Sequence, residues 1–169
     1  MDVVAVDVET TGRSACLGHR ITEIALVGRV IDEFCVDIDP RGAEAPTFGS
    51  VHEEIVARIE HRVVVGHKIS FDLEFLAREF ERLPGAHLPT ITYIDTLALA
   101  KKTLDHDGTS WTLSAVATRL DLDPDGPLHT ALVDARLALN IFDSLIEYYD
   151  KPNLKTLGLR RLIWGGVSP

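Results

Sequence analysis

Cysteine, methionine and long apolar runs are scarce in this sequence. It has one methionine and two cysteines, Cys16 and Cys35, whose spacing is not that of a metal site. No apolar run approaches the roughly 18 residues of a membrane span, and no basic segment leads into an apolar one as in a signal peptide. We therefore expect a protein that does not enter the membrane, lies in the cytoplasm and keeps both thiols free.

Low-complexity segments and internal repeats are absent as well. With 46% hydrophobic residues among 169, the chain is long enough for one buried core, which we expect to occupy residues 1–150, with residues 151–169 as an extension. Basic residues are outnumbered, 17 against 26 acidic ones, for a net charge of −9. This balance argues against a protein that binds nucleic acid through a broad basic surface, but not against one that reaches phosphate through metal ions.

The first predicted strand carries two acidic residues at its end. Residues 3–9 read Val-Val-Ala-Val-Asp-Val-Glu, with apolar residues on both alternating faces, as in a central strand covered on both sides. Asp7 and Glu9 are separated by one residue and so point to the same face. Two carboxylates side by side at the end of a buried strand repel each other, and a divalent cation would compensate both.

Two more aspartates interrupt the apolar stripes of predicted helices. Each occupies a position, at steps of three or four residues, where an apolar residue is expected, so Asp72 and Asp134 should point inward. The stripes are Ile69, Asp72, Leu76, Phe80 and Leu83 in one helix, and Ala131, Asp134, Ala138, Phe142, Leu145 and Tyr149 in the last long helix.

A histidine precedes the last helix. His129 and Asp134 are separated by a rotation of about 140° on a helix, so they cannot share a face if both are helical. Gly126 and Pro127 break the chain just upstream. We therefore expect His129 on the loop ahead of the helix, where its side chain can swing.

Each of these signals has an ordinary structural explanation when taken alone. An Asp-x-Glu at a strand end is often solvated, Asp72 near a helix start can act as a cap, and a loop histidine usually faces solvent. Their occurrence together, in this chain order, favours a common site. All of them can converge at the carboxyl end of one sheet, where open α/β folds bind ligands.

Three ordered motifs contain these residues. They are Val-Val-Ala-Val-Asp-Val-Glu-Thr-Thr-Gly at residues 3–12, Val-Gly-His-Lys-Ile-Ser-Phe-Asp at 65–72 and His-Thr-Ala-Leu-Val-Asp-Ala at 129–135. With them the sequence resembles the DEDDh family of 3′→5′ exonucleases, which includes the proofreading epsilon subunit of bacterial DNA polymerase III, RNase T and oligoribonuclease. His129, in place of a tyrosine in the third motif, assigns the histidine branch.

The resemblance implies a two-metal active site. By it, Asp7, Glu9 and Asp134 hold one divalent cation, Mg²⁺ or Mn²⁺, while Asp7 and Asp72 help to hold the second. It also implies that His129 is the general base and that the products are nucleoside 5′-monophosphates. The expected substrate-binding residues are Thr10, which would lie against the terminal nucleotide, Thr11, Lys68 and Phe71.

The sequence departs from the family at two places. Lys68 stands where many members have Asn. Many members also have a longer loop with a His-Gly-Ile-like turn that contacts the terminal bases, whereas here only residues 39–49 connect strand to helix and no such turn is recognisable. The Lys68 ammonium either contacts a substrate phosphate, pairs with a carboxylate such as Asp72 or faces solvent. These departures concern how the 3′ end of the substrate is bound, and not the residues expected to carry out hydrolysis.

The predicted order of elements is typical of the RNase H-like fold. This is an α/β fold with a mixed five-stranded sheet of order 3-2-1-4-5 and helices on both faces. Strands are expected at residues 3–9, 21–30, 33–38, 63–65 and 91–94, the first three antiparallel. Helices are expected at residues 50–61, 96–104 and 110–120, with two more along the stripes described above.

Residues 151–169 differ in character from the rest of the chain, because they are basic and apolar without an acid. The extension either packs back on the domain and covers its last helix, or docks on a polymerase or another subunit. Its basic residues are Lys151, Lys155, Arg160 and Arg161, and its large apolar ones are Leu154, Leu157, Leu159, Leu162, Ile163 and Trp164.

The expected partner is a nucleic-acid 3′ end, single-stranded or frayed. DNA proofreading or end trimming is the first expectation, and degradation of short RNA or RNA 3′ ends the second. The rivals are a catalytically inactive nucleic-acid or subunit-binding module, against which the intact carboxylates argue, and a phosphatase, against which the ordered motifs argue. The candidates to guide the strand by charge are Arg13, Arg20, Lys68, Lys101 and Lys102.

Overall fold

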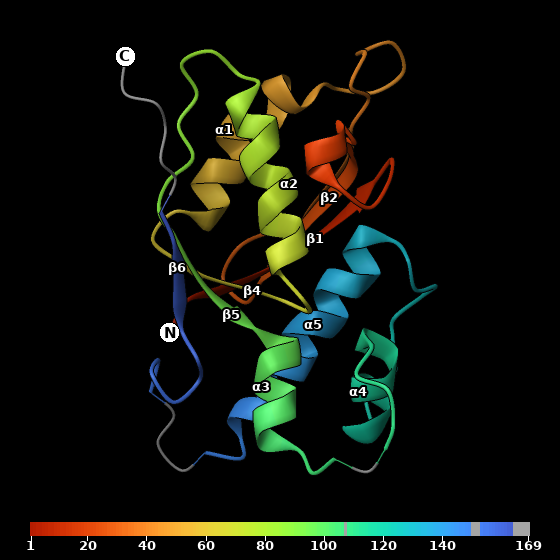
Figure 1. Ribbon diagram of the computed structural model, residues 1–169, viewed down its shortest axis with the longest axis vertical. Coiled ribbons are helices and arrows are strands. Elements are labelled where there is room, and N and C mark those ends of the chain that lie inside the picture. The colour runs from red at the N-terminus through yellow and green to blue at the C-terminus, as the bar shows by residue number, and fades with distance from the viewer. Residues whose placement is uncertain (107, 150–152, 164–169) are drawn as a thin grey trace.

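The computed structural model describes residues 1–106, 108–149 and 153–163, which form a six-stranded sheet between two layers of helices (Figure 1). The strands are β1 (Val3–Thr10), β2 (Ile21–Gly28), β3 (Phe34–Asp37), β4 (Val63–Gly66), β5 (Ile91–Asp95) and β6 (Arg160–Leu162). Their order is β3-β2-β1-β4-β5-β6. β1 lies inside the sheet, antiparallel to β2 and parallel to β4.

Helices cover both faces of this sheet. They are the short 3-10 helix η1 (Ala15–Leu17) and the α-helices α1 (Phe48–Ile59), α2 (Ser70–Glu81), α3 (Thr96–Thr103), α4 (Leu113–Arg119) and α5 (Ala131–Ile146). α1 and α2 cover one face of the sheet, and α3, α4 and α5 cover the other (Figure 1). The core on the first face contains Val4 and Val6 of β1, and the core on the second contains Val3 and Ala5. No helix in the described part of the chain is long and apolar enough to cross a bilayer.

The predicted sheet order 3-2-1-4-5 and the antiparallel start are confirmed. The ends of two helices differ from the predicted ones. α4 begins three residues later than predicted, because the Thr112 side chain accepts a hydrogen bond from the Ala115 N–H and caps the helix there. α5 ends at Ile146, so Tyr149, the last member of the predicted stripe, lies beyond the helix.

The extension after the last helix adds a sixth strand, which the predicted five-stranded sheet lacked. Leu157 is buried in the layer of α3, α4 and α5, and Lys102 Nζ donates a hydrogen bond to the Thr156 carbonyl at 2.6 Å. β6 then pairs antiparallel with β5 and forms the edge of the sheet. Lys151 and Trp164, which belong to the predicted extension, lie outside the described residues.

β4 ends early beside β1, and this opens the sheet. The parallel pairing covers only residues 3–5 of β1, because β4 stops at Gly66 and the chain turns into α2. A Cβ at Gly66 would lie 2.9 Å from the Val6 carbonyl oxygen, so this approach requires glycine. From Asp7 onward, β1 has no strand paired with it on the β4 side within the described residues.

A buried ion pair ties the loop after β1 to α2. Glu79 is 1% exposed, and its two carboxylate oxygens accept hydrogen bonds from the Arg20 guanidinium at 2.6 and 2.7 Å. One of these oxygens also accepts the Ile21 N–H at 3.3 Å. This bidentate contact holds the end of the loop, so the chain enters β2 at a defined position.

We expect Glu79→Ala to destabilise the fold. Removing one member of a buried pair costs roughly 3–5 kcal/mol, but Arg20 keeps 30% exposure and recovers part of its hydration, so a loss of about 2–3 kcal/mol is expected. Urea unfolding measures the change in free energy. Glu81→Ala is the matched control, because Glu81 lies in the same helix in an exposed pair with Arg78, and it should cost much less. Equal losses would show that the burial of Glu79 is irrelevant.

Candidate active site

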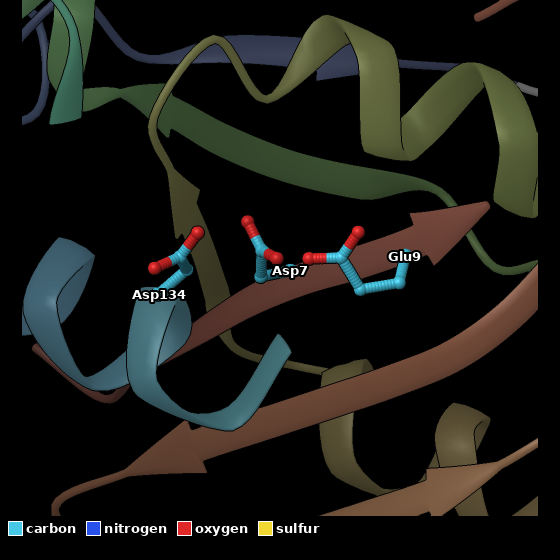
Figure 2. Close-up of side chains that lie close together, drawn as sticks. All are labelled: Asp7, Glu9 and Asp134. Carbon is cyan, nitrogen blue, oxygen red and sulfur yellow. The ribbon is translucent and has the colours of Figure 1, made fainter. Parts of the chain in front are cut away.

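Three carboxylates converge at the C-terminal end of β1. Asp7 and Glu9 point from this strand toward the face that α5 covers, and Asp134 comes from the first turn of that helix (Figure 2). One oxygen of each group lies within 4.8 Å of the others. α5 crosses here because its apolar side, including Phe142, packs on the β1 and β2 residues of this face. Strand alternation and helix packing thus join residues far apart in the sequence.

Asp72 approaches the same place from α2. It is 4% exposed, and its Oδ1 accepts a hydrogen bond from the Val8 N–H at 3.1 Å. Val8 lies beyond the last β1 residue that pairs with β4, so β4 offers no carbonyl to its N–H. The Asp72 carboxylate accepts this hydrogen bond instead. The Asp72 charge is close enough to raise the pKa of Asp7. All four predicted metal ligands therefore meet at one end of the sheet.

A cleft of 540 Å³ joins these carboxylates to His129. Its lining consists of Asp7, Val8, Glu9, Arg13, His67, Lys68, Phe71, Asp72, His129 and Asp134. The structure thus brings the five predicted catalytic residues into one cavity, together with two of the four predicted substrate-binding residues.

Burial raises the pKa of all four carboxyl groups, and the charges of neighbouring carboxylates add to this effect. For Asp7, burial is the largest cause, followed by the charges of Asp72, Asp134 and Glu9. Burial also raises the pKa of Asp72, against the hydrogen bond from the Val8 N–H, which lowers it. Burial and then the charge of Asp134 raise the pKa of Glu9, and burial raises that of Asp134. Such an arrangement favours protons or cations as the compensating charge.

The donor set suits a hard divalent cation. Carboxylate oxygens are the ligands that Mg²⁺ and Mn²⁺ prefer, whereas zinc sites usually contain His or Cys. Asp134 Oδ1 is buried, and no group among the described residues donates a hydrogen bond to it. A buried carboxylate oxygen without a hydrogen-bond donor has lost its hydration without compensation, which is energetically costly. A bound cation would offset this cost.

His129 lies on the loop just before α5, with a left-handed φ of 68°. Its N–H donates a hydrogen bond to Asp134 Oδ2 at 3.4 Å, which ties the loop to the cluster. The residue is exposed, and a positive charge on its ring lowers the pKa of both Glu9 and Asp134. The imidazole is therefore accessible and close to the carboxylates, as a group that exchanges protons must be.

His67 lines the same cleft, but its ring is held on both sides. Nδ1 lies 3.1 Å from Thr96 Oγ1, and Nε2 lies 2.8 Å from the Trp111 carbonyl oxygen, to which it must donate. Burial lowers the pKa of this imidazole. With both nitrogens engaged, His67 joins the end of β4 to α3 and to the segment before α4, and it is not placed to take a proton from a substrate.

Lys68 and Phe71 form the wall of the cleft between β4 and α2. Lys68 has a φ of 62°, a left-handed conformation that is unfavourable for a residue with a Cβ, and its N–H donates to Asp95 Oδ1 at 2.9 Å. Its exposed side chain lines the cleft. The Phe71 ring is partly buried against Phe75, with their centroids 4.8 Å apart. A cation and an aromatic ring thus stand beside the acidic cluster.

Thr10 and Thr11 are not among the described residues that line the cleft. Thr10 Oγ1 donates a hydrogen bond to the Gly12 carbonyl at 2.7 Å. Thr11 Oγ1 accepts the Arg20 N–H at 3.0 Å and lies 3.3 Å from His19 Nδ1. In this structure both hydroxyls therefore shape the loop after β1.

Glu23 lies beside the cluster, although the sequence does not single it out. It is directly opposite Glu9 in the antiparallel pairing of β1 and β2. Its charge contributes to the raised pKa of Asp7, Glu9 and Asp134. The available signal is an acidic residue on an otherwise apolar strand face, but only the strand register reveals that this residue faces Glu9.

Comparison with known proteins places these residues in a family. The family model described as Exonuclease, of RNase T, matches residues 29–142. The chain is 31% identical to the 3′-5′ exonuclease DinG of Bacillus subtilis, over 94% of this chain but only 19% of that protein. It is 27% identical to the DNA polymerase III epsilon subunits of Rickettsia felis and Escherichia coli, over 84% and 82% of this chain and 72% and 69% of theirs.

Solved structures have the same fold. Exonuclease X in complex with 5′ overhanging duplex DNA matches with a TM-score of 0.68 at 18% identity, covering 92% of this chain and 97% of the other. The Mg²⁺- and Mn²⁺-bound form of S. pombe Pop2p matches with a TM-score of 0.71 at 14% identity, covering 93% and 87%. These matches confirm the predicted RNase H-like exonuclease fold. With the family model matching most of its length, the chain belongs to the RNase T, or DEDDh, family of 3′–5′ exonucleases, which are phosphodiester hydrolases.

Proposed function

We propose that this chain removes nucleotides from DNA 3′ ends, releasing nucleoside 5′-monophosphates in a reaction that needs two divalent cations, Mg²⁺ or Mn²⁺. The proposal depends on one observation. Oxygens of Asp7, Glu9 and Asp134 lie within 4.8 Å of one another, in a cleft that Asp72 and His129 also line. Four carboxylates and one base in a single cleft are the groups that metal-assisted hydrolysis of a phosphodiester requires.

The four carboxylates are proposed to hold the cations. Asp7, Glu9 and Asp134 form one set of ligands, and Asp7 with Asp72 forms the other, because Asp7 is close to all three partners. When bound, two such cations stabilise the attacking and leaving oxygens of an in-line displacement at phosphorus.

His129 is proposed as the general base. Its imidazole is exposed at the cleft, whereas both ring nitrogens of His67 already have partners. A neutral imidazole can accept the proton of the attacking water, and the nearby carboxylates of Glu9 and Asp134 stabilise the imidazolium that forms.

A DNA strand is the proposed substrate, because relatives that align over most of the chain are DNA polymerase III epsilon subunits. Arg13 and Lys68 are the basic residues among the described ones that line the cleft, and they come from the loop after β1 and the turn before α2. We place the phosphates of the last nucleotides near the Arg13 and Lys68 side chains, and one nucleobase against the Phe71 ring. Because the chain has a net charge of −9, we expect it to contact only a few nucleotides of the strand.

Linear single-stranded DNA should be shortened from its 3′ end. A 5′-labelled oligonucleotide should give a descending ladder in Mg²⁺ and none with a chelator, while a circular strand of the same composition stays intact. Asp134→Asn, purified in parallel, should lose activity by at least about 10²-fold, which excludes a contaminating nuclease. Cleavage of the circular strand at the same rate as the linear one would refute exonuclease action. Faster shortening of an RNA of the same sequence would mean that RNA, and not DNA, is the preferred substrate.

Cation binding should stabilise the fold more at high pH. The pKa values of Asp7 and Asp72 are raised in the folded protein, so these groups keep their protons to a higher pH than they do in the unfolded chain. The stability of the metal-free protein therefore falls as the pH rises above the ordinary Asp value of 3.8 toward the raised values. Because Mg²⁺ takes the place of these protons, its effect on Tm should be larger at about pH 8 than at about pH 5.5.

Asp7→Asn tests the origin of this effect. With a chelator present, the variant should melt above the wild type at about pH 8, because Asn is neutral without a proton, whereas the Asp7 carboxyl is ionised in the unfolded chain and must take up a proton on folding. The difference should shrink at about pH 5.5. The variant should also lose most of the rise in Tm that Mg²⁺ causes. Melting below the wild type at the higher pH, or near-normal turnover, would contradict the role given to Asp7.

His129→Ala should separate proton transfer from metal binding. Loss of a general base typically lowers kcat by about 10²- to 10⁴-fold, and the Mg²⁺-induced rise in Tm should remain. His67→Ala is the control, since His67 lines the same cleft with its nitrogens engaged, and it should lose less than about tenfold. Equal losses in the two variants would mean that the base is another group.

A further inference from the structure

Glu23 adds a negative charge beside the carboxylate cluster without belonging to it. It faces Glu9 across the β1–β2 pairing, on the side of the sheet that α5 covers. Among the described residues, however, the group of three or more possible ligands whose atoms all lie within 4.8 Å of one another consists of Asp7, Glu9 and Asp134, without Glu23. A further anion at this place increases the repulsion without supplying a ligand. Its presence therefore calls for a different explanation.

The Glu23 carboxylate makes a hydrogen bond to the beginning of α5. Its Oε2 accepts the Ala131 N–H at 3.2 Å, and its Oε1 accepts the Cys35 thiol at 3.2 Å. Ala131 is the first residue of α5, and the first amides of a helix have no partner within the helix. The N-cap residue, Thr130, makes no side-chain hydrogen bond to these amides, and its hydroxyl donates to the Pro127 carbonyl. Glu23 thus caps α5 from a neighbouring strand.

The capped turn carries the parts of the site that do not come from the sheet. Asp134 lies in this first turn, and His129 lies two residues before Ala131. On the other side, Glu23 is held in β2 directly beside Glu9 of β1. The contact between Glu23 and Ala131 therefore links β2, the strand paired with the one that bears Asp7 and Glu9, to the helix that bears Asp134.

We propose that Glu23 is a positioning residue, which keeps Asp134 and His129 aligned with the carboxylates of β1. This inference rests on the proposed metal-dependent nuclease function. Other contacts hold α5 farther along its length, since Arg136 pairs with Glu33 at 2.5 Å. That contact fixes the body of the helix, whereas the Glu23 contact fixes its first turn.

Two substitutions of Glu23 distinguish this role from a role of its charge. Both Glu23→Gln and Glu23→Ala remove the negative charge, but only Glu23→Gln keeps a side-chain oxygen that can accept the Ala131 N–H. Glu33→Ala serves as the matched control, because it removes a carboxylate partner of α5 away from the cluster. Positioning by the hydrogen bond predicts that the alanine variant at residue 23 differs from the other two.

Amide hydrogen exchange of the metal-free protein gives a readout that is independent of activity. In Glu23→Ala, the amides of residues 130–134 should exchange about fivefold faster or more, because the first turn loses a partner. In Glu23→Gln and Glu33→Ala, exchange in this segment should stay within about twofold of the wild type. Unchanged exchange in Glu23→Ala would overturn the proposal.

Mg²⁺ titrations of exonuclease activity give the second readout. Glu23→Ala should lower kcat by about tenfold or more and raise the Mg²⁺ concentration at half-saturation several-fold, while Glu23→Gln restores both to within about threefold. Equal losses in the two variants would overturn the proposal in favour of an effect of charge. If the wild type itself degraded no DNA, the proposed function would fail, whereas the exchange experiment would still decide whether Glu23 holds α5.

Discussion

Repulsion between carboxylates is the interaction on which the arrangement of this protein depends. Asp7, Glu9 and Asp134 would separate if their elements could move, and burial raises the cost of their charges. Two apolar layers prevent this movement, because β1 is packed on one face by α1 and α2 and on the other by α3, α4 and α5. Dense packing of this kind has low compressibility, so the packed elements yield little to the repulsion. The core therefore holds the charges in place for a cation.

Much of this arrangement follows from local patterns in the sequence. Alternation along residues 3–9 determines which side chains of β1 share a face, and helical periodicity determines that Asp72 and Asp134 point inward. Both patterns depend only on backbone geometry, so they can be recognised without knowing which elements pack against the strand or helix. The order of the five predicted strands came instead from the resemblance of the element order to the RNase H-like fold, and it was confirmed.

The remaining features depend on where elements end and on how strands are aligned. Glu23 meets Glu9 only in the observed register of β1 and β2, which no local pattern specifies. β6 is three residues long, too short for periodicity to reveal it. The contact of Thr10 with the terminal nucleotide came from the motif resemblance and stays a prediction, whereas the hydrogen bond from its hydroxyl to the Gly12 carbonyl was not foreseen. Contacts made between distant segments are therefore the part that required the structure.

Asp72 has a consequence for the interpretation of mutants. Because β4 stops short, its carboxylate accepts the Val8 N–H and so completes the hydrogen bonding of β1 at the point where the sheet divides. Asp72→Ala would remove a proposed cation ligand and, at the same time, leave the Val8 N–H without its partner. Its inactivity would mix a chemical defect with a folding defect. Pressure to retain an acceptor at this position would then act even on a descendant of this protein that had lost its catalytic activity.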